Sequence, residues 1–254
     1  MHFPSSSRSS LPASLGLAAL GLVSLGLAAA PARAQTQDLF VSNGNAGTIS
    51  RFAGTGPGTF STTATTLSGL NTPQGLAFDG RGDLFAVNSI SNSITEFAAG
   101  TTPGTFGATS TLSGGLSGPF GLAVDARGDL FAANNSGSSI TEFASTGAGT
   151  FATGTTFATG GTLNRPLGLA FDARGDLFAT NVSGNSVTEF ASTGAGTFGA
   201  GKTVETGLSQ PSFLAFSPLP SAPVPEASTT VSLGLLLALG MGGMVVAARK
   251  KRKA

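Results

Sequence analysis

The chain has 254 residues and contains no cysteine, tryptophan or tyrosine, whereas glycine occurs 38 times and phenylalanine 19 times. Because cysteine is absent, no disulfide can stabilise an exported form of the chain, and packing and hydrogen bonding must do so. The formal net charge is +1, but residues 35–223 carry eleven acidic against six basic side chains and no basic stripe, which excludes a nucleic acid as the expected partner.

Residues 1–34 have the features of a secretory signal peptide. One basic residue, Arg8, precedes an apolar run of leucine, alanine and glycine, which ends at the small residues Ala32 and Ala34. A small-x-small pattern of this kind marks a cleavage site, so we expect cleavage before Gln35. The signal helix predicts that the rest of the chain is exported. The alternative is an amino-terminal membrane anchor, for which the apolar run is short.

The other end of the chain predicts a transmembrane helix. Residues 231–248 are uncharged and apolar, and a helix of that length would span about 27 Å, close to the hydrocarbon thickness of a bilayer. The basic tail, residues 249–254, is expected to stay on the cytoplasmic side, which leaves residues 35–217 outside. A proline-rich linker, residues 218–230, joins the two parts. The basic side chains of the tail are Arg249, Lys250, Lys251, Arg252 and Lys253.

The linker carries the motif Val224-Pro225-Glu226 shortly before the apolar segment. Pro-Glu, an apolar helix and a terminal basic cluster, in that order, resemble the PEP-CTERM sorting signal of bacteria that make exopolysaccharide. The resemblance implies that an exosortase-type protease removes the tail and releases the protein to the cell envelope surface or the extracellular matrix. Ala227 departs from the family pattern, which usually has proline there. The alternative is an ordinary single-span anchor.

Between these ends the sequence repeats itself about every 46 residues. The triplet Asp-Leu-Phe recurs at spacings of 45, 46 and 47 residues, beginning at Asp38, Asp83, Asp129 and Asp176. Each full copy, such as PFGLAVDARGDLFAANNSGSSITEFA from Pro119, contains three short apolar runs separated by turn residues, and a weaker fourth run follows, over residues 150–157 in this copy. These features predict an all-β fold, a small β-propeller of four repeats over residues 35–217.

The ends of the repeat region predict how the ring closes. The first copy starts with the second strand of a unit, and PSFLAFS, from Pro211, supplies a first strand. We therefore expect residues 213–216 to pair with residues 39–42, so that the N- and C-terminal strands complete one blade without an exposed edge. Two alternatives stay open: a β-solenoid, and an incomplete ring that closes by dimerisation. Small residues suit the crowding of inner strands near the axis: Ala77, Ala123, Ala170 and Ala215.

The repeats contain Gly-Leu-Ala-Phe-Asp, Gly-Asp-Leu-Phe, Asn and Ile-Thr-Glu-Phe in that order. This pattern resembles NHL-type propellers, and more closely their streptogramin-lyase-like branch. The resemblance implies a fold but not one chemistry, because such propellers host many functions. For lyases of that branch it implies a histidine base and a divalent cation. The one histidine here, His2, lies in the signal peptide, so the mature chain has no histidine base and no catalytic residue is assigned.

Acidic residues recur in register in every unit. A ring of carboxylates could bind calcium, a cation that prefers oxygen ligands, but residues repeated in every blade are more often structural acceptors for turn N–H groups. We therefore expect no cofactor and no metal site, with calcium as the alternative. The strand-ending Asn43, Asn88, Asn134 and Asn181 are interpreted in the same way. The acidic positions are Asp79, Asp125, Asp172, Asp83, Asp129, Asp176, Glu96, Glu142 and Glu189.

Two functions from different classes follow. The first is an exported, non-enzymatic propeller that acts as a scaffold or binding module, with the membrane, an exosortase-type protease, polysaccharide or surface proteins as partners. The second is a metal-dependent lyase or lactonase that uses carboxylate and asparagine side chains at the mouth of the propeller. Because the mature chain lacks histidine, the sequence favours the first and predicts no enzyme. The Arg-Gly-Asp triplets predict no adhesion role, since they share one turn position: Arg81, Arg127 and Arg174.

Overall fold

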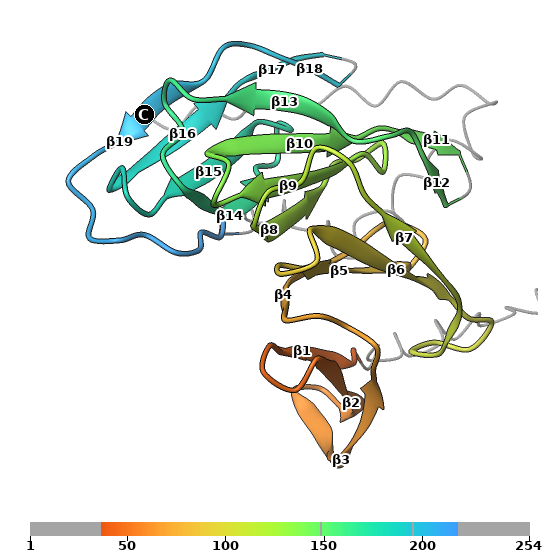
Figure 1. The fold of residues 1–254 in the computed structure, drawn as a ribbon. Coiled ribbons are helices and arrows are strands. Elements are labelled where there is room, and N and C mark those ends of the chain that lie inside the picture. Colours follow the sequence, from red (N-terminus) through yellow and green to blue (C-terminus); the bar gives the residue numbers. More distant parts are fainter. Residues whose placement is uncertain (1–36, 148, 195, 218–254) are drawn as a thin grey trace, which may run out of the picture.

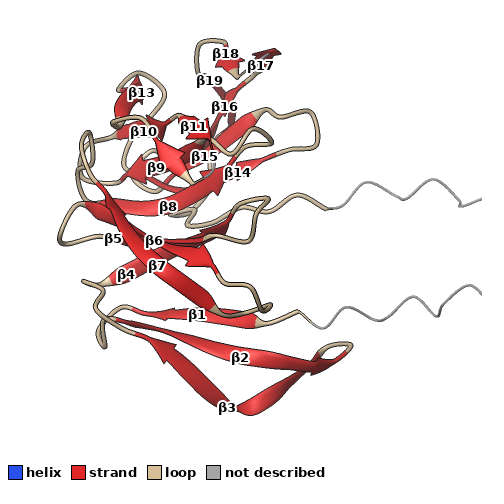
Figure 2. Ribbon diagram, turned by 90° about the vertical axis from the view of Figure 1, so that its right-hand side faces the viewer, coloured by secondary structure: helices blue, strands red, loops and turns tan. Residues whose placement is uncertain are grey.

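The structure, a computed structural model, describes residues 37–147, 149–194 and 196–217. All regular elements in these ranges are strands (Figure 2). No helix in this part of the chain is long and apolar enough to cross a membrane. The predicted signal peptide, linker, transmembrane helix and basic tail lie outside the described residues, as do the predicted cleavage and sorting positions: Ala32, Ala34, Val224, Pro225, Glu226, Arg249, Lys250, Lys251, Arg252 and Lys253.

Four antiparallel sheets, the blades, follow one another along the chain (Figure 1). The strands of each blade lie side by side in the order in which they occur in the sequence. This arrangement confirms the all-β propeller architecture that the repeat predicts. The strands of blades one and two are β1 (Leu39–Asn43), β2 (Thr48–Gly56), β3 (Thr59–Leu67), β4 (Pro73–Phe78), β5 (Leu84–Asn88), β6 (Ser93–Ala99) and β7 (Phe106–Leu112).

Blades three and four each carry an additional two-stranded ribbon between their third and fourth strands. The run expected to form one strand over residues 150–157 is therefore divided between the ribbon and the blade. The blade strands are β8 (Pro119–Val124), β9 (Leu130–Asn134), β10 (Ser139–Phe143), β13 (Thr155–Thr159), β14 (Pro166–Phe171), β15 (Leu177–Asn181), β16 (Ser186–Phe190) and β19 (Lys202–Glu205); the ribbon strands are β11 (Ser145–Gly147), β12 (Thr150–Phe151), β17 (Ser192–Gly194) and β18 (Thr197–Phe198).

A tight turn of the type Asp-x-Arg-Gly-Asp joins the first two strands of each full blade. In blade three the N–H of Gly128 donates to the carbonyl of Asp125 at 3.0 Å, and the N–H of Asp125 donates to the carbonyl of Asp129 at 3.0 Å. Gly128 has a φ of +88°, which glycine adopts at little cost. The turn therefore fixes the register of the first two strands of each full blade.

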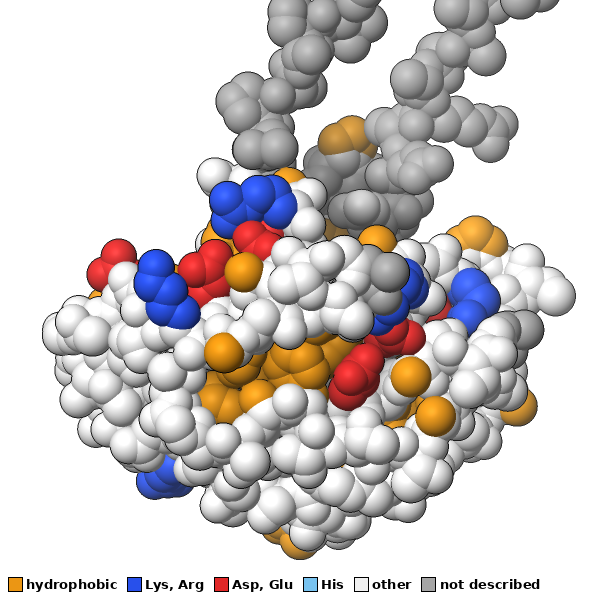
Figure 3. Space-filling model, turned by 90° about the horizontal axis from the view of Figure 1, so that it is seen from above, with side chains coloured by type: hydrophobic (Ala, Val, Ile, Leu, Met, Phe, Trp, Pro, Cys, Tyr) orange, Lys and Arg blue, Asp and Glu red, His pale blue; other side chains and the backbone are white. Residues whose placement is uncertain are grey.

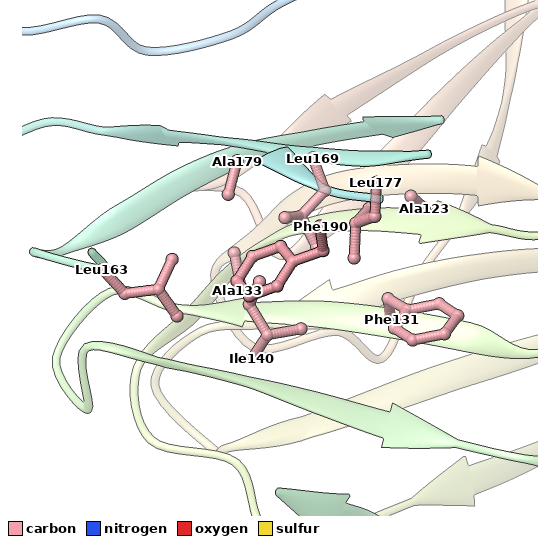
Figure 4. Close-up of a cluster of buried hydrophobic side chains, with 9 residues drawn as sticks. All are labelled: Ala123, Phe131, Ala133, Ile140, Leu163, Leu169, Leu177, Ala179 and Phe190. Atoms are coloured by element: carbon pink, nitrogen blue, oxygen red, sulfur yellow. The ribbon is translucent and has the colours of Figure 1, made fainter. Parts of the chain in front are cut away.

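The second strand of blades two and three is buried along its whole length because neighbouring blades cover both of its faces. Figure 4 shows how blades three and four meet: the ring of Phe131 lies among side chains that come from both blades. Burial of one such side chain contributes about 1.5 to 3 kcal/mol. Phenylalanine rings add edge-to-face contacts, with centroids 5.3 Å apart for Phe131 and Phe157 and 5.4 Å apart for Phe131 and Phe171. The cluster comprises Ala123, Phe131, Ala133, Ile140, Leu163, Leu169, Leu177, Ala179 and Phe190.

One glycine in each inner strand fixes how closely neighbouring blades approach. A Cβ added to Gly75 would overlap the carbonyl oxygen of Phe120 in the next blade, and a Cβ added to Gly121 would overlap that of Leu167. No positive φ requires glycine at either position, so the close approach of the two main chains is the reason for it. The same contact at successive boundaries gives the blades a constant spacing.

The predicted pairing of residues 213–216 with residues 39–42 is wrong for this structure. The first blade has three strands, β1, β2 and β3, and residues 211–217 form no strand. The blades form an arc whose two ends do not join (Figures 1 and 2). The reason is the constant spacing of the blades: residues 211–217 pack on blade four as a further inner strand would, with the carbonyl oxygen of Ser212 over Gly168, and this position is not that of a partner for β1.

Candidate functional site

Two sets of loops lie on the same side of the blades. One set joins the second strand of a blade to the third, and the other leads into the inner strand. They are hydrogen bonded to each other: the N–H of Asn135 donates to the carbonyl of Gly118 at 3.0 Å, and the N–H of Val182 donates to that of Arg165 at 3.2 Å. We call this side the loop face; its segments are residues 44–47, 68–72, 89–92, 113–118, 135–138, 160–165, 182–185 and 207–210.

The repeated aspartates lie away from the loop face and act as structural acceptors. In blade three, Oδ1 of Asp125 accepts the N–H groups of Arg127 and Asp129, both at 2.9 Å. Oδ1 of Asp129 accepts the N–H of Ser145 at 2.7 Å, which ties the turn to the ribbon. Blades two and four repeat these bonds, and in blade one Oδ1 of Asp38 accepts the N–H of Gly54 at 2.9 Å. Each aspartate is therefore already used in folding.

The turn arginines neutralise these carboxylates. Arg174 lies 2.9 Å from Oδ2 of Asp172 and 2.8 Å from Oδ2 of Asp176. Burial alone would raise the pKa of the Asp172 carboxyl, but the N–H groups of Asp176 and Arg174 and the Arg174 guanidinium together hold this pKa below its ordinary value. Glu142 behaves oppositely: burial, and then the charge of Asp129, raise its pKa. The Arg-Gly-Asp triplets are thus parts of the turn itself.

The described residues do not fit a metal ion. No group of three or more histidine, cysteine, aspartate or glutamate side chains in these ranges could hold one. The strand-ending asparagines are also occupied: Nδ2 of Asn181 donates to Ser186 at 3.2 Å and to Thr188 at 2.9 Å, and its Oδ1 accepts the N–H of Asn164 at 3.1 Å. The carboxylate and asparagine site expected at the mouth of the propeller is therefore not assembled by the predicted residues.

The loop face presents a different side chain in each blade on one repeated backbone. The residue before the inner-strand proline has a φ of +52° at Thr72, +55° at Gly118, +52° at Arg165 and +46° at Gln210. Because the backbone is the same in all four, this conformation belongs to the fold and is no sign of a site. What changes is the side chain that the backbone presents, which is how loops on a rigid scaffold acquire function.

A hollow of about 520 Å³ lies on the loop face between blades three and four. Polar groups, among them Asn185 and Gln210, surround it, and the inner-strand residues Phe120 and Leu167 give it an apolar wall. All of its lining residues are in loops or near the first residue of an inner strand. They are Phe120, Asn135, Arg165, Leu167, Val182, Ser183, Asn185 and Gln210.

Arg165 is the charged group of this hollow. Oδ1 of Asn135 accepts hydrogen bonds from its Nε at 3.2 Å and its Nη2 at 2.9 Å. Asn135 is itself 4 % exposed and donates through Nδ2 to the carbonyl oxygens of Arg165 and Pro166. Of the arginines in the described ranges, Arg165 alone forms no ion pair. A permanent positive charge is thus held in place, exposed, with no carboxylate against it.

Neither Asn135 nor Arg165 is among the residues that the sequence singles out. The repeat analysis identifies residues that all units share, whereas Asn135 and Arg165 each occur in only one unit. Blades one, two and four have Gly44, Ser89 and Val182 in place of Asn135. The deviation from the repeat is the signal in the sequence that could have identified them.

Two further hollows are built differently. The larger, of about 810 Å³, lies between blades one and two, and its arginine, Arg51, is paired with Asp38 at 2.6 Å. Another, of about 360 Å³, is lined by Phe157, Phe190 and Phe198. Seen from above, the molecule is hollowed over hydrophobic side chains, with acidic and basic groups near the rim (Figure 3). Neither hollow combines an unpaired charge with an asymmetric set of polar groups.

Comparisons with known proteins identify the architecture. No protein-family model and no curated protein sequence matches this chain. Among solved structures, a streptogramin B lyase is similar with a TM-score of 0.55 at 16% identity, over 69% of this chain and 54% of the lyase. The chain has the propeller fold of these enzymes. A putative 6-phosphogluconolactonase of Bacteroides uniformis is similar with a TM-score of 0.57 at 18% identity, over 68% and 56% of the two chains.

A gluconolactonase of Xanthomonas campestris is also similar, with a TM-score of 0.53 at 21% identity, over 70% of this chain and 62% of that one. The chain therefore spans little more than half the length of the structures it resembles. These three structures, of a lyase, a putative 6-phosphogluconolactonase and a gluconolactonase, correct one expectation: they point away from a non-enzymatic scaffold and toward the enzymatic alternative.

Proposed function

We propose that this chain is a propeller enzyme of the lyase and lactonase type that acts on a small lactone or ester at the loop-face hollow between blades three and four. The observation that carries the proposal is Arg165, the arginine of the described ranges that forms no ion pair. Lactonases are among the proteins with this fold, and attack of water on a lactone places negative charge on its carbonyl oxygen.

Arg165 would bind the carbonyl oxygen and stabilise the charge that develops on it. Asn135 holds Nε and Nη2 of the guanidinium, so the orientation of the donors is set before the substrate binds. Phe120 and Leu167 offer an apolar wall, and the exposed Asn185 offers an amide for a substrate hydroxyl.

In lactone hydrolysis a water molecule attacks the carbonyl carbon, the ring C–O bond breaks, and the ring oxygen takes a proton, which gives a hydroxy acid. The hollow is lined by no histidine, aspartate or glutamate. The contribution of the protein is therefore binding and polarisation of the carbonyl, and solvent exchanges the protons. Because the described carboxylates do not fit a divalent cation, no step passes through a metal.

Hydrolysis of a panel of γ- and δ-lactones, including gluconolactone, followed by acid release in a pH-stat, tests the proposal. We expect Arg165→Met to lower kcat/KM by about a factor of 100 or more, the usual effect of losing one preorganised donor to an oxyanion. Lys202→Met is the matched control, because Lys202 is an exposed cation on β19, outside the hollow. Equal rates for both variants, or no turnover of any lactone by the intact protein, would refute the proposal.

We also propose that the enzyme is exported, passes through a single-span membrane intermediate, and is sorted to the cell envelope surface or matrix by an exosortase-type protease. The sequence supports this through residues outside the described ranges, Val224, Pro225 and Glu226 with the basic tail. Mass spectrometry of the secreted protein tests it. Termini near Gln35 and near Glu226 are expected, and an intact basic tail on the secreted form would refute the sorting step.

A further inference from the structure

We propose that two copies of this chain join head to tail into one closed ring, in which residues 211–217 of each copy form the inner strand of blade one in the other. The inference does not depend on the catalytic proposal. It rests on two parts of the arc that have no strand partner among the described residues: the edge of β1 opposite β2, called its free edge below, and the inner-strand segment 211–217.

The free edge of β1 exposes apolar side chains at positions that an inner strand covers in the other blades. Leu39 is 43% exposed and Val41 is 40% exposed. Their counterparts in blades two, three and four are completely buried beneath an inner strand and the neighbouring blade. These counterparts are Leu84, Leu130 and Leu177 for Leu39, and Ala86, Ala132 and Ala179 for Val41. An exposed strand edge of this composition is a surface for β-strand addition.

Residues 211–217 have the sequence and the position of an inner strand. PSFLAFS matches PFGLAVD of blade three and PLGLAFD of blade four at the proline, the leucine, the alanine and the length. The carbonyl oxygen of Ser212 lies over Gly168, as that of Leu167 lies over Gly121. Phe213 is 71% exposed and Phe216 is 44% exposed. The segment is thus set in place for a blade that this copy does not supply.

A hydroxyl on β1 is placed to receive this segment. In blade four, Oγ1 of Thr180 accepts the N–H of Gly168 at 2.9 Å and lies 2.9 Å from the carbonyl oxygen of Ser212, so it links two adjacent inner strands. Ser42 holds the same position in blade one and donates to the carbonyl of Gln74 at 2.8 Å. The N–H of an incoming Phe213 would complete the same pair of bonds. The two internal blades have no hydroxyl there; they have Val87 and Ala133.

The register of the joint follows from the other blades. In blade four Leu169 pairs with Ala179, and Phe171 pairs with Leu177. By the same register, Leu214 of one copy would pair with the partner's Val41. The full set would be Pro211 with Asn43, Leu214 with Val41, Ala215 with Phe40, and Phe216 with Leu39.

The occupant is a second copy because residues 211–217 of the same copy pack on blade four and, although Phe213 lines one hollow with Val41 and Ser42, form no strand pairing with β1. Two arcs of four blades give eight, which is within the range of known propellers. A head-to-tail contact repeated twice closes a ring and leaves no free edge. Phe213 stands where the other inner strands have glycine, so its insertion would widen the boundary between blades one and two of the receiving copy.

Cysteine cross-linking of the full-length chain in detergent tests this proposal, since the natural sequence has no cysteine. Chains carrying only Val41→Cys and chains carrying only Leu214→Cys are co-expressed and oxidised. We expect a cross-linked product of twice the chain mass, and light scattering of the unmodified protein should give twice the mass that mass spectrometry finds for one chain. The control replaces Leu214→Cys by Ala215→Cys, which faces the opposite side of the strand and should not cross-link.

Closure within one chain predicts something else. It would give a cross-link only when Val41→Cys and Leu214→Cys are in the same chain, in a product of single mass. That result overturns the proposal, as does a monomer by light scattering together with no cross-link between the co-expressed chains. Equal cross-linking of Ala215→Cys and Leu214→Cys would overturn the register.

Discussion

Oδ1 of Asn135 in blade three accepts two hydrogen bonds from the guanidinium of Arg165 at the start of blade four. The same asparagine donates to the carbonyl oxygens of Arg165 and Pro166, so one side chain fixes both the main chain and the charge at this blade boundary. The position of the charge is therefore a product of the packing of the two blades.

Replacement of Asn135 by leucine should lower stability and activity together. The change keeps the size of the side chain but removes one donor from the carbonyl oxygens of Arg165 and Pro166; that of Arg165 keeps the N–H of Val182, and each lost hydrogen bond costs about 0.5 to 1.5 kcal/mol. Urea unfolding measures this loss. If Arg165 binds substrate, KM for the lactone should rise as well, because the guanidinium loses its fixed orientation. Val182→Ala, at the same position of blade four, should change stability much less.

Replacement of Gly121 by alanine should force blades three and four apart. The added methyl group would overlap the carbonyl oxygen of Leu167, which is main chain and cannot rotate away. Overpacking of this kind costs about 1 to 3 kcal/mol. Gly80→Ala is the matched control, because an added Cβ there meets nothing within 4 Å and no positive φ is required. Equal thermal midpoints for the two variants would contradict the spacing role of Gly121.

Asp129→Asn should destabilise the fold without any contribution from calcium. Asp129 is 6 % exposed, accepts the N–H of Ser145 at 2.7 Å and is paired with Arg127. Loss of the charge weakens both interactions, and we expect a loss of about 2 kcal/mol in unfolding free energy. Glu205→Gln on the exposed strand β19 should have little effect. A calcium-dependent rise in the melting temperature of the wild type, absent in Asp129→Asn, would instead assign a metal to this turn.

The charge of Glu142 should make stability fall as the pH rises. Burial and then Asp129 raise the pKa of Glu142 above its ordinary value of 4.5, against the opposing effect of Arg127. The folded state therefore holds the proton more tightly than the unfolded state, and stability is lost as pH rises from 4.5 through the folded pKa. Glu142→Gln should raise the melting temperature at pH 7 but not at pH 4. An equal effect at both values would show that ionisation is not the cause.

The sequence predicts the local structure within each repeat. The strands, the Asp-x-Arg-Gly-Asp turns and the structural use of Asp125 and Asp129 follow from residues that lie next to each other in the chain. Closure could not be predicted in this way. It depends on the angle between blades, which results from contacts such as Gly121 with Leu167, and the same repeat pattern is compatible with rings of different size.

The candidate site was missed for a related reason. Arg165 and Asn135 are 30 positions apart, and nothing in the spacing indicates that they meet. They come together because one follows the second strand of a blade and the other precedes the inner strand of the next. The prediction of no enzyme rested on the absence of histidine and on the repeated carboxylates, although the repeat pattern already resembled the streptogramin-lyase-like branch; the solved structures with this fold point to the enzymatic alternative.

Gly75 contacts the main-chain carbonyl of Phe120 in the next blade, and Gly121 contacts that of Leu167 in the same way. In both contacts the next blade contributes only main-chain atoms. A blade can therefore be followed by a copy of itself without any change in the surface that the copy meets. Duplication of one 46-residue unit within the gene would lengthen the arc and add one more presented position to the loop face. Duplication of a unit, followed by substitution at the presented position, would thus cost this protein little stability.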